Sequence, residues 1–118
     1  AKGFRAFSPA PPLEHPTALW ADERALPWVL DGSTLLRMTK DSGWARSEVP
    51  FASPLALAGS SSSEVWLAGE GGAALFDGTR FVCIRDLPGP FSGITRAGDD
   101  WWFWGAEGAF RLRRTPRD

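Results

Sequence analysis

A tryptophan-centred segment recurs along this chain of 118 residues, and the repeat limits the fold more than any other feature. It recurs after 38 residues, from Trp28 to Trp66, and again after 36 residues, to Trp102. Each tryptophan lies in a short apolar run that is followed by a turn-forming stretch and a second apolar run. Repeats of this length indicate one supersecondary unit that stacks on copies of itself.

The middle repeat, residues 64–81, shows the pattern most clearly. It reads as an apolar run, a glycine break, a second apolar run, an Asp-Gly pair and the start of a third run. Glycine supplies the positive φ that tight hairpins need, and Asp77-Gly78 suits a two-residue type I′ turn. We therefore predict three short strands joined by two hairpins in this repeat.

An inner strand precedes each tryptophan run, and an outer strand closes the unit. The predicted inner strands are residues 17–20, 55–58 and 93–96. The predicted outer strands are residues 43–50 and 80–88. Residues 3–9 share the aromatic start and the proline-rich end of these outer strands, so we expect the chain to begin on an outer strand.

The fold class that follows is all-β, in a single domain spanning residues 1–118. We expect three four-stranded repeats, at about residues 17–50, 55–88 and 93–114, with residues 3–9 completing the last. Four-stranded units of this length are typical of β-propeller blades. An N-terminal strand that pairs with the last repeat would leave no long unpaired sheet edge.

The middle repeat also carries the pattern V-W-x-x-G-x-G-G-x-x-x-x-D-G-x-x-[WF]. Its fixed positions are Val65, Trp66, Gly69, Gly71, Gly72, Asp77, Gly78 and Phe81. This pattern resembles the blade repeat of bacterial β-propellers related to the kelch and YVTN-type families. The resemblance extends over nearly the whole chain and implies a propeller-like fold.

Three blades are fewer than the roughly four to eight that propellers use. We favour a homodimer in which residues 4–7 of each chain complete the partner's Trp102 blade, so that six blades form a closed ring with twofold symmetry. Two alternatives stay open: a fragment of a longer repeat array, or part of a larger assembly with another protein.

The composition excludes several classes of partner. Lys and Arg number 13 against 14 for Asp and Glu, and the pI is near 5.8, so neither nucleic acid nor an anionic membrane is expected as a partner. No apolar run reaches the roughly 18 residues of a membrane-spanning helix. Cys83, the single cysteine, is expected to be a buried small hydrophobe. We expect no metal site and no cofactor, and the sequence predicts no localisation.

The tryptophans suggest two different uses. We expect Trp28, Trp66 and Trp102 to pack in the core, because each lies mid-strand among apolar neighbours. Trp20, near the end of an inner strand, is the tryptophan we assign most readily to the surface. An exposed aromatic face on repeated blades would suit a small multivalent lectin.

Carboxylates recur in the turns that are expected to share one rim of the ring. Asp31, Glu70 and Glu107 each follow the tryptophan strand of one repeat, and together they would attract a cation or a basic partner. Glu14 and the single histidine, His15, lie in a loop expected at the same rim. The alternative is that all five are ordinary solvated loop residues.

The function expected from these features is non-catalytic recognition, or a scaffold role, in which rim loops bind a protein partner. Its candidate ligand-binding residues are Glu14, His15, Trp20, Asp31, Glu70 and Glu107. Enzymatic activity is disfavoured and no catalytic residue is assigned, because no Ser or Cys nucleophile has a recognisable context. Besides the lectin, a hydrolase at the mouth of the central channel stays an alternative, and it would depend on His15, Glu70 or Glu107.

Overall fold

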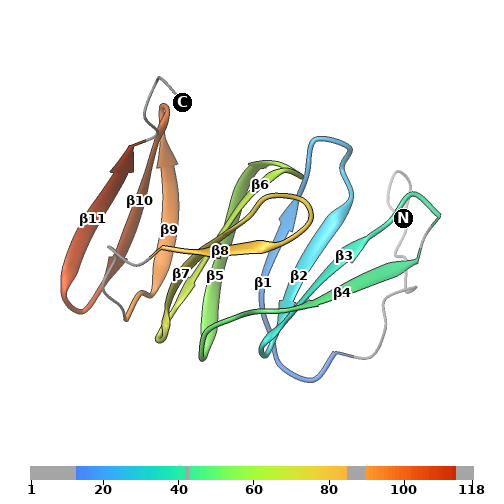
Figure 1. Ribbon diagram of the computed structural model, residues 1–118, viewed down its shortest axis with the longest axis horizontal. Coiled ribbons are helices and arrows are strands. Elements are labelled where there is room, and N and C mark those ends of the chain that lie inside the picture. Colours follow the sequence, from blue (N-terminus) through green and yellow to red (C-terminus); the bar gives the residue numbers. More distant parts are fainter. Residues whose placement is uncertain (1–12, 42, 85–89, 114–118) are drawn as a thin grey trace, which may run out of the picture.

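The computed structural model describes residues 13–41, 43–84 and 90–113, which form eleven strands and no helix (Figure 1). The first sheet contains β1 (Pro16–Ala21), β2 (Pro27–Asp31), β3 (Thr34–Met38) and β4 (Trp44–Glu48). The second contains β5 (Pro54–Ser61), β6 (Glu64–Gly69), β7 (Gly72–Phe76) and β8 (Phe81–Cys83). The third contains β9 (Gly93–Ala97), β10 (Asp100–Gly105) and β11 (Gly108–Arg113).

Each sheet is an antiparallel meander in which every strand pairs with the next one along the chain. The all-β prediction is therefore confirmed, and the sheets coincide with the three sequence repeats. The third sheet has three strands in the described part of the chain. Residues 3–9, which were expected to supply its fourth strand, lie outside the described residues.

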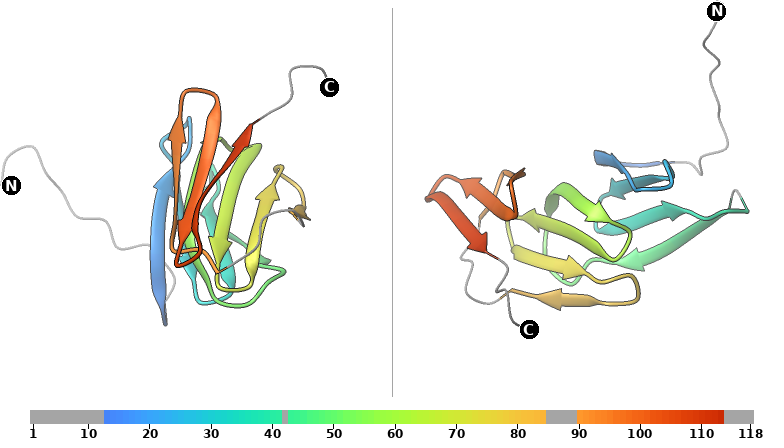
Figure 2. Two further views of the ribbon diagram at one scale, coloured as in Figure 1. Left: turned by 90° about the vertical axis from the view of Figure 1, so that its left-hand side faces the viewer. Right: turned by 90° about the horizontal axis from the view of Figure 1, so that it is seen from above.

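The sheets lie side by side through their first strands, because β5 contacts β1 on one side and β9 on the other. Seen from above, β4 and β8 lie at the edge away from β1 (Figure 2). Backbone hydrogen bonds fix the segments that connect the sheets to the β6–β7 turn at one end of the strands: Gly71 N–H donates to Ala52 O at 2.9 Å, and Phe91 N–H donates to Gly69 O at 2.9 Å. We call this end, with the turns at residues 31–34, 69–72 and 105–108, the connection rim.

One predicted turn is wrong in detail. Phe76 pairs with Phe81, so residues 77–80 form a four-residue connection rather than a two-residue Asp-Gly turn. The Asp77 carboxylate accepts hydrogen bonds from the backbone N–H groups of Thr79, at 2.9 Å, and Arg80, at 3.0 Å. These local hydrogen bonds stabilise the longer turn, as short polar side chains often do.

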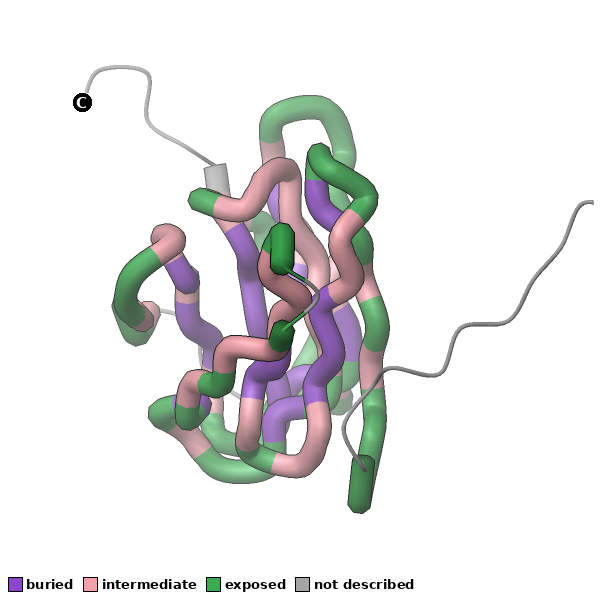
Figure 3. Tube along the Cα trace, turned by 90° about the vertical axis from the view of Figure 1, so that its right-hand side faces the viewer, coloured by how far each residue is buried: buried purple, intermediate pink, exposed green. Residues whose placement is uncertain are grey.

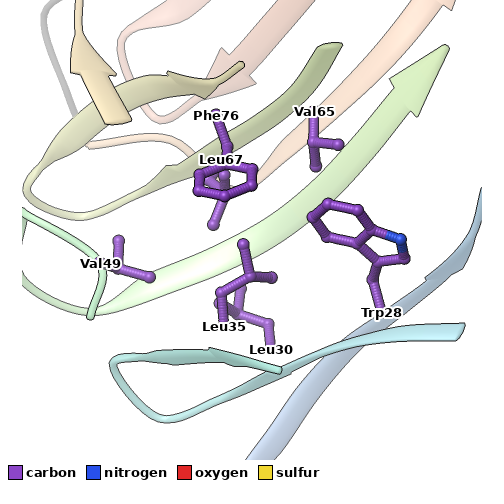
Figure 4. Packing of buried hydrophobic residues seen from close by; sticks show 7 residues of the cluster. All are labelled: Trp28, Leu30, Leu35, Val49, Val65, Leu67 and Phe76. Atoms are coloured by element: carbon purple, nitrogen blue, oxygen red, sulfur yellow. The ribbon is translucent and has the colours of Figure 1, made fainter. Parts of the chain in front are cut away.

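The first core lies between the first two sheets. Side chains alternate along a strand, so Trp28 and Leu30 of β2 point to the same side. Together with Leu35 they pack against Val65, Leu67 and Phe76 of the second sheet (Figure 4).

The second core lies between the second and third sheets. Trp66 and Ala68, on the other side of β6, pack with Trp101 and Phe103 of β10 and with Phe91. Strand β6 is therefore buried on both sides, which explains its unbroken apolar run. The buried residues follow the central strands, and the loops are mostly exposed (Figure 3).

Two sequence expectations about burial are corrected. Trp28 and Trp66 are core residues, as predicted, but Trp102 is only half-buried, because no further sheet covers its side of β10 in the described part of the chain. Cys83 is exposed rather than buried, because it lies on the edge strand β8.

Candidate functional site

Two sheet faces at the ends of the stack are the first candidate surface. Trp101 and Phe103 pack on the second sheet, so Trp102 and Trp104 point to the opposite side of β10, which we call the C-terminal face. Similarly, Val29 and its cross-strand neighbour Leu19 point away from the second sheet, on the N-terminal face.

The C-terminal face carries the most exposed tryptophan of the chain. Trp104 is 43% exposed, and its ring lies against the backbone of Gly93. A Cβ at Gly93 would lie 2.0 Å from the ring, so only glycine lets the indole lie there. Beside it, the Arg111 guanidinium stacks on Trp102 at 5.9 Å and forms an ion pair with Asp100 at 3.6 Å.

The N-terminal face is apolar. Leu19 is 71% exposed, the largest exposure among the large apolar side chains of the described residues. A cavity of about 390 Å³ opens beside it. It is lined by Leu13, Pro16, Thr17, Ala18, Leu19 and Val29.

The second candidate is a polar cavity at the connection rim. The Asp31 carboxylate accepts hydrogen bonds from the backbone N–H groups of Glu14, at 3.1 Å, and His15, at 2.6 Å. Gly32 N–H in turn donates to His15 O at 3.0 Å, so the segment before β1 is fixed to the β2–β3 turn. The cavity beside them has a volume of about 320 Å³. Its lining residues are Glu14, His15, Asp31, Gly32, Ser33, Thr34 and Arg46.

The structure thus brings three of the six candidate residues together and leaves three apart. Glu70 and Glu107 are exposed in the β6–β7 and β10–β11 turns of the connection rim, one in each of the other two sheets. Trp20 is half-buried, with its ring edge-on to Trp28 at 5.6 Å and against Gly59. It serves the packing between the first two sheets.

Sequence reasoning missed Trp104 as the surface tryptophan. Its signal is its position: Trp104 lies two residues after Trp102, on the same side of the last tryptophan strand. In the first two repeats, the corresponding side is covered by the sheet of the next repeat.

No protein-family model, curated protein or solved structure matches this chain. Within residues 13–41, 43–84 and 90–113, no three His, Cys, Asp or Glu side chains lie close enough together to hold a metal ion. The same residues contain no helix long and apolar enough to cross a membrane.

Proposed function

We propose that this chain is a non-catalytic recognition module, built of three kelch- or YVTN-like propeller blades that form a six-bladed ring with a second copy. The observation that carries the proposal is the match between its two end faces. Inside the chain, a face with Trp28 or Trp66 packs on a face of the following sheet. The C-terminal face, with Trp102, is equivalent to the faces with Trp28 and Trp66. The N-terminal face, with Val29, is equivalent to the faces on which those two tryptophans pack.

Strand register supports this equivalence. In each sheet, the last residue of the tryptophan strand pairs with the first residue of the next strand across a hairpin. Trp28, Trp66 and Trp102 each lie three residues before that last residue. Val29, Leu67 and Phe103 follow them directly, and Leu67 and Phe103 pack on the preceding sheet. A C-terminal face therefore fits an N-terminal face of another copy, by the contact that the chain already makes twice.

Twofold symmetry makes two such junctions for one association. Covering Leu19 and the exposed part of Trp104 contributes on the order of 4 kcal/mol per junction. The lost translational and rotational freedom costs about 4 to 15 kcal/mol. One junction barely offsets the lower end of this range, whereas two junctions, at about 8 kcal/mol, exceed that lower end, so a closed dimer is favoured over an open pair. Residues 3–9 of one copy, placed beside β11 of the other, would complete the third sheet.

Charged substitutions on the end faces test the ring. We expect Leu19→Asp and Trp104→Asp each to convert a dimer to a monomer in sedimentation velocity. Val82→Asp is the matched control, since Val82 is 44% exposed but lies on β8 of the middle sheet. A dimer that survives both end-face substitutions would exclude this ring.

The partner surface that we propose is the connection rim, and the partner is a protein with a basic patch. Glu14, Glu70 and Glu107 are exposed there, and no described residue forms an ion pair with their carboxylates. Dimerisation doubles this set and adds to the negative field.

A tetralysine peptide is a suitable probe for the rim. We expect salt-sensitive binding that weakens in the Glu70→Gln, Glu107→Gln double variant, measured by calorimetry. Asp99→Asn, an exposed turn carboxylate at the opposite end of the third sheet, is the control and should bind like the parent. Equal weakening in both variants would mean that only the net charge matters.

The exposure of Trp104 favours one second candidate, carbohydrate binding. An exposed indole is a platform for stacking on a sugar ring, and the Arg111–Asp100 pair on the same sheet supplies hydrogen-bonding groups. Glucose, galactose and N-acetylglucosamine are the probes. Saturable quenching of tryptophan fluorescence that Trp104→Ala abolishes would support this function, and absence of quenching would exclude it for these sugars.

A further inference from the structure

A basic cavity opens at the rim opposite the connection rim, within the first sheet. Its volume is about 240 Å³. The lining residues are Asp22, Arg24, Leu26, Trp28, Arg37, Met38, Thr39, Lys40 and Asp41. Three cations, Arg24, Arg37 and Lys40, therefore surround a space with one apolar wall.

Arg37 is the central cation of this cavity. It is half-buried, and its guanidinium stacks on Trp28 at 5.6 Å and on Phe76 at 5.7 Å. Stacking on aromatic rings holds the guanidinium in place, but the N–H groups along its edge still need hydrogen-bond acceptors.

Comparison with the third sheet shows what Arg37 lacks. Arg37 pairs with Trp28 in the same register as Arg111 with Trp102. Arg111 has a carboxylate, Asp100, at 3.6 Å. Asp100 lies two residues before Trp102, and the residue two before Trp28 is Leu26. The first sheet therefore keeps the stacked arginine but replaces its counter-charge by leucine.

The carboxylates of the cavity do not take that place. Asp22 is buried, and its carboxylate accepts hydrogen bonds from Arg24 N at 2.9 Å, Leu26 N at 3.1 Å and Trp28 Nε1 at 3.0 Å. Asp41 is exposed. In the described part of the chain, no carboxylate forms an ion pair with Arg24, Arg37 or Lys40.

The loop that carries Arg24 is held in a fixed shape. Besides the bonds to its carboxylate, Asp22 N–H donates to Leu26 O at 3.1 Å, and Ala25 N–H donates to Asp22 O at 2.9 Å. Ala25 adopts a φ of 61°, which a non-glycine residue keeps only where surrounding contacts impose it. A preformed loop lowers the entropy lost when a ligand binds.

We infer that this cavity binds a small oxyanion, a carboxylate or a phosphate, through Arg24, Arg37 and Lys40. The Arg37 fork donates to two oxygens, and Lys40 adds a mobile positive charge. Leu26, Trp28 and Met38 contact the apolar part of the molecule that bears the anion. The cavity belongs to the first sheet alone, so its occupation does not depend on ring formation or on the connection rim.

Inorganic phosphate and acetate are the probes, each titrated into the full chain by calorimetry at constant ionic strength. We expect saturable binding at one site per chain. The probe that binds more tightly shows whether the site prefers a tetrahedral phosphate or a planar carboxylate. No saturable binding of either probe would overturn the inference.

Two exposed cations supply variants that leave the fold intact. Arg24→Gln and Lys40→Gln should each weaken binding by about tenfold, the effect of one lost charge-assisted contact. Arg46→Gln removes an exposed arginine at the other rim and should leave the affinity unchanged. If all three variants weaken binding equally, the anion is attracted by net charge and the assigned site is wrong.

Discussion

Two tryptophan–arginine pairs occupy the same register in different sheets, and their surroundings differ. Trp28 is 1% exposed, its ring packs on Phe76 of the next sheet at 5.8 Å, and the Arg37 guanidinium lies over both rings. Trp102 is half-buried, and the Arg111 side chain is 47% exposed. The pairs match in residue type, spacing and stacking. The first pair is covered by the following sheet, and the last pair has Asp100 as a counter-charge for Arg111.

A repeat position therefore has no fixed role of its own. The first pair belongs to the core because another sheet covers it, and the last pair forms a surface because no sheet of the described residues covers it. An aromatic surface with the composition of a core face suits association with a matching face. This is why we assign the C-terminal face to a second copy.

The largest expected effect on stability is that of removing the Trp28 side chain, which is covered by the second sheet. We expect Trp28→Ala to lower the free energy of unfolding by about 3 to 5 kcal/mol, since it leaves a cavity and removes the hydrogen bond that Trp28 Nε1 donates to the Asp22 carboxylate. At the equivalent position of the third repeat, Trp102→Ala should lower the free energy of unfolding by about 1 to 2 kcal/mol when the chain is monomeric, because the side chain is already partly hydrated.

Urea denaturation of both variants at low protein concentration measures this difference. The Leu19→Asp background keeps the chains monomeric and serves as the common reference. Equal losses for Trp28→Ala and Trp102→Ala would mean that the two faces do not differ as described.

The next effect concerns Asp22, whose carboxylate accepts a hydrogen bond from the Trp28 indole. Burial opposes ionisation of this carboxyl, but hydrogen bonds from the Trp28 indole and the Leu26 and Arg24 backbone outweigh it and lower the pKa of Asp22 below its usual 3.8. A carboxyl with a lowered folded-state pKa stabilises the fold above its unfolded-state pKa, and this stabilisation is lost as the pH falls through the folded-state value.

We therefore expect the parent chain to lose stability as the pH falls below about 3.8, toward the lower folded-state pKa of Asp22. Asp22→Asn should cost about 1 to 2 kcal/mol at neutral pH and should flatten this acid dependence. Thermal unfolding at several pH values checks both. An unchanged acid slope in the variant would show that Asp22 is not the group responsible.

The last comparison is between the two arginines, and the difference expected between them is about 1 kcal/mol. Arg37→Gln should cost about 2 kcal/mol, because the variant loses the cation–π contacts of a half-buried guanidinium with both Trp28 and Phe76. Arg111→Gln should cost at most about 1 kcal/mol, since its guanidinium is 3.6 Å from Asp100 and its side chain is 47% exposed. Chemical denaturation measures both, and a larger loss for Arg111→Gln would reverse the assignment of covered and uncovered faces.

Much of the fold could be predicted from local sequence signals. Three signals predicted the strand positions and the number of sheets: the recurring tryptophans Trp28, Trp66 and Trp102, the turn-forming residues between the strands, and the apolar runs around them. These signals work because hairpin pairing is local: Gly69 pairs with Gly72, and Gly105 with Gly108. The buried run of β6 also follows from sequence, since an apolar strand without alternation needs cover on both sides.

The remaining features depend on contacts that a single sequence does not encode locally. Trp102 and Trp104 have the sequence context of core residues, but within residues 13–41, 43–84 and 90–113 no sheet covers their side of β10. Cys83 has apolar neighbours but lies on an edge strand. In the basic cavity, Leu26 takes the place that Asp100 has in the third sheet. This equivalence can be recognised only once the strand register is known. The convergence of Glu14, His15 and Asp31 depends on a loop folding back onto a turn.

The most direct test of the ring is the solution mass of the unmodified chain. Light scattering coupled to size exclusion, over a range of concentrations, should give twice the chain mass of 12.8 kDa, and Leu19→Asp should give 12.8 kDa. A mass of 12.8 kDa for the unmodified chain at every concentration would contradict the account, because the two end faces would then not associate.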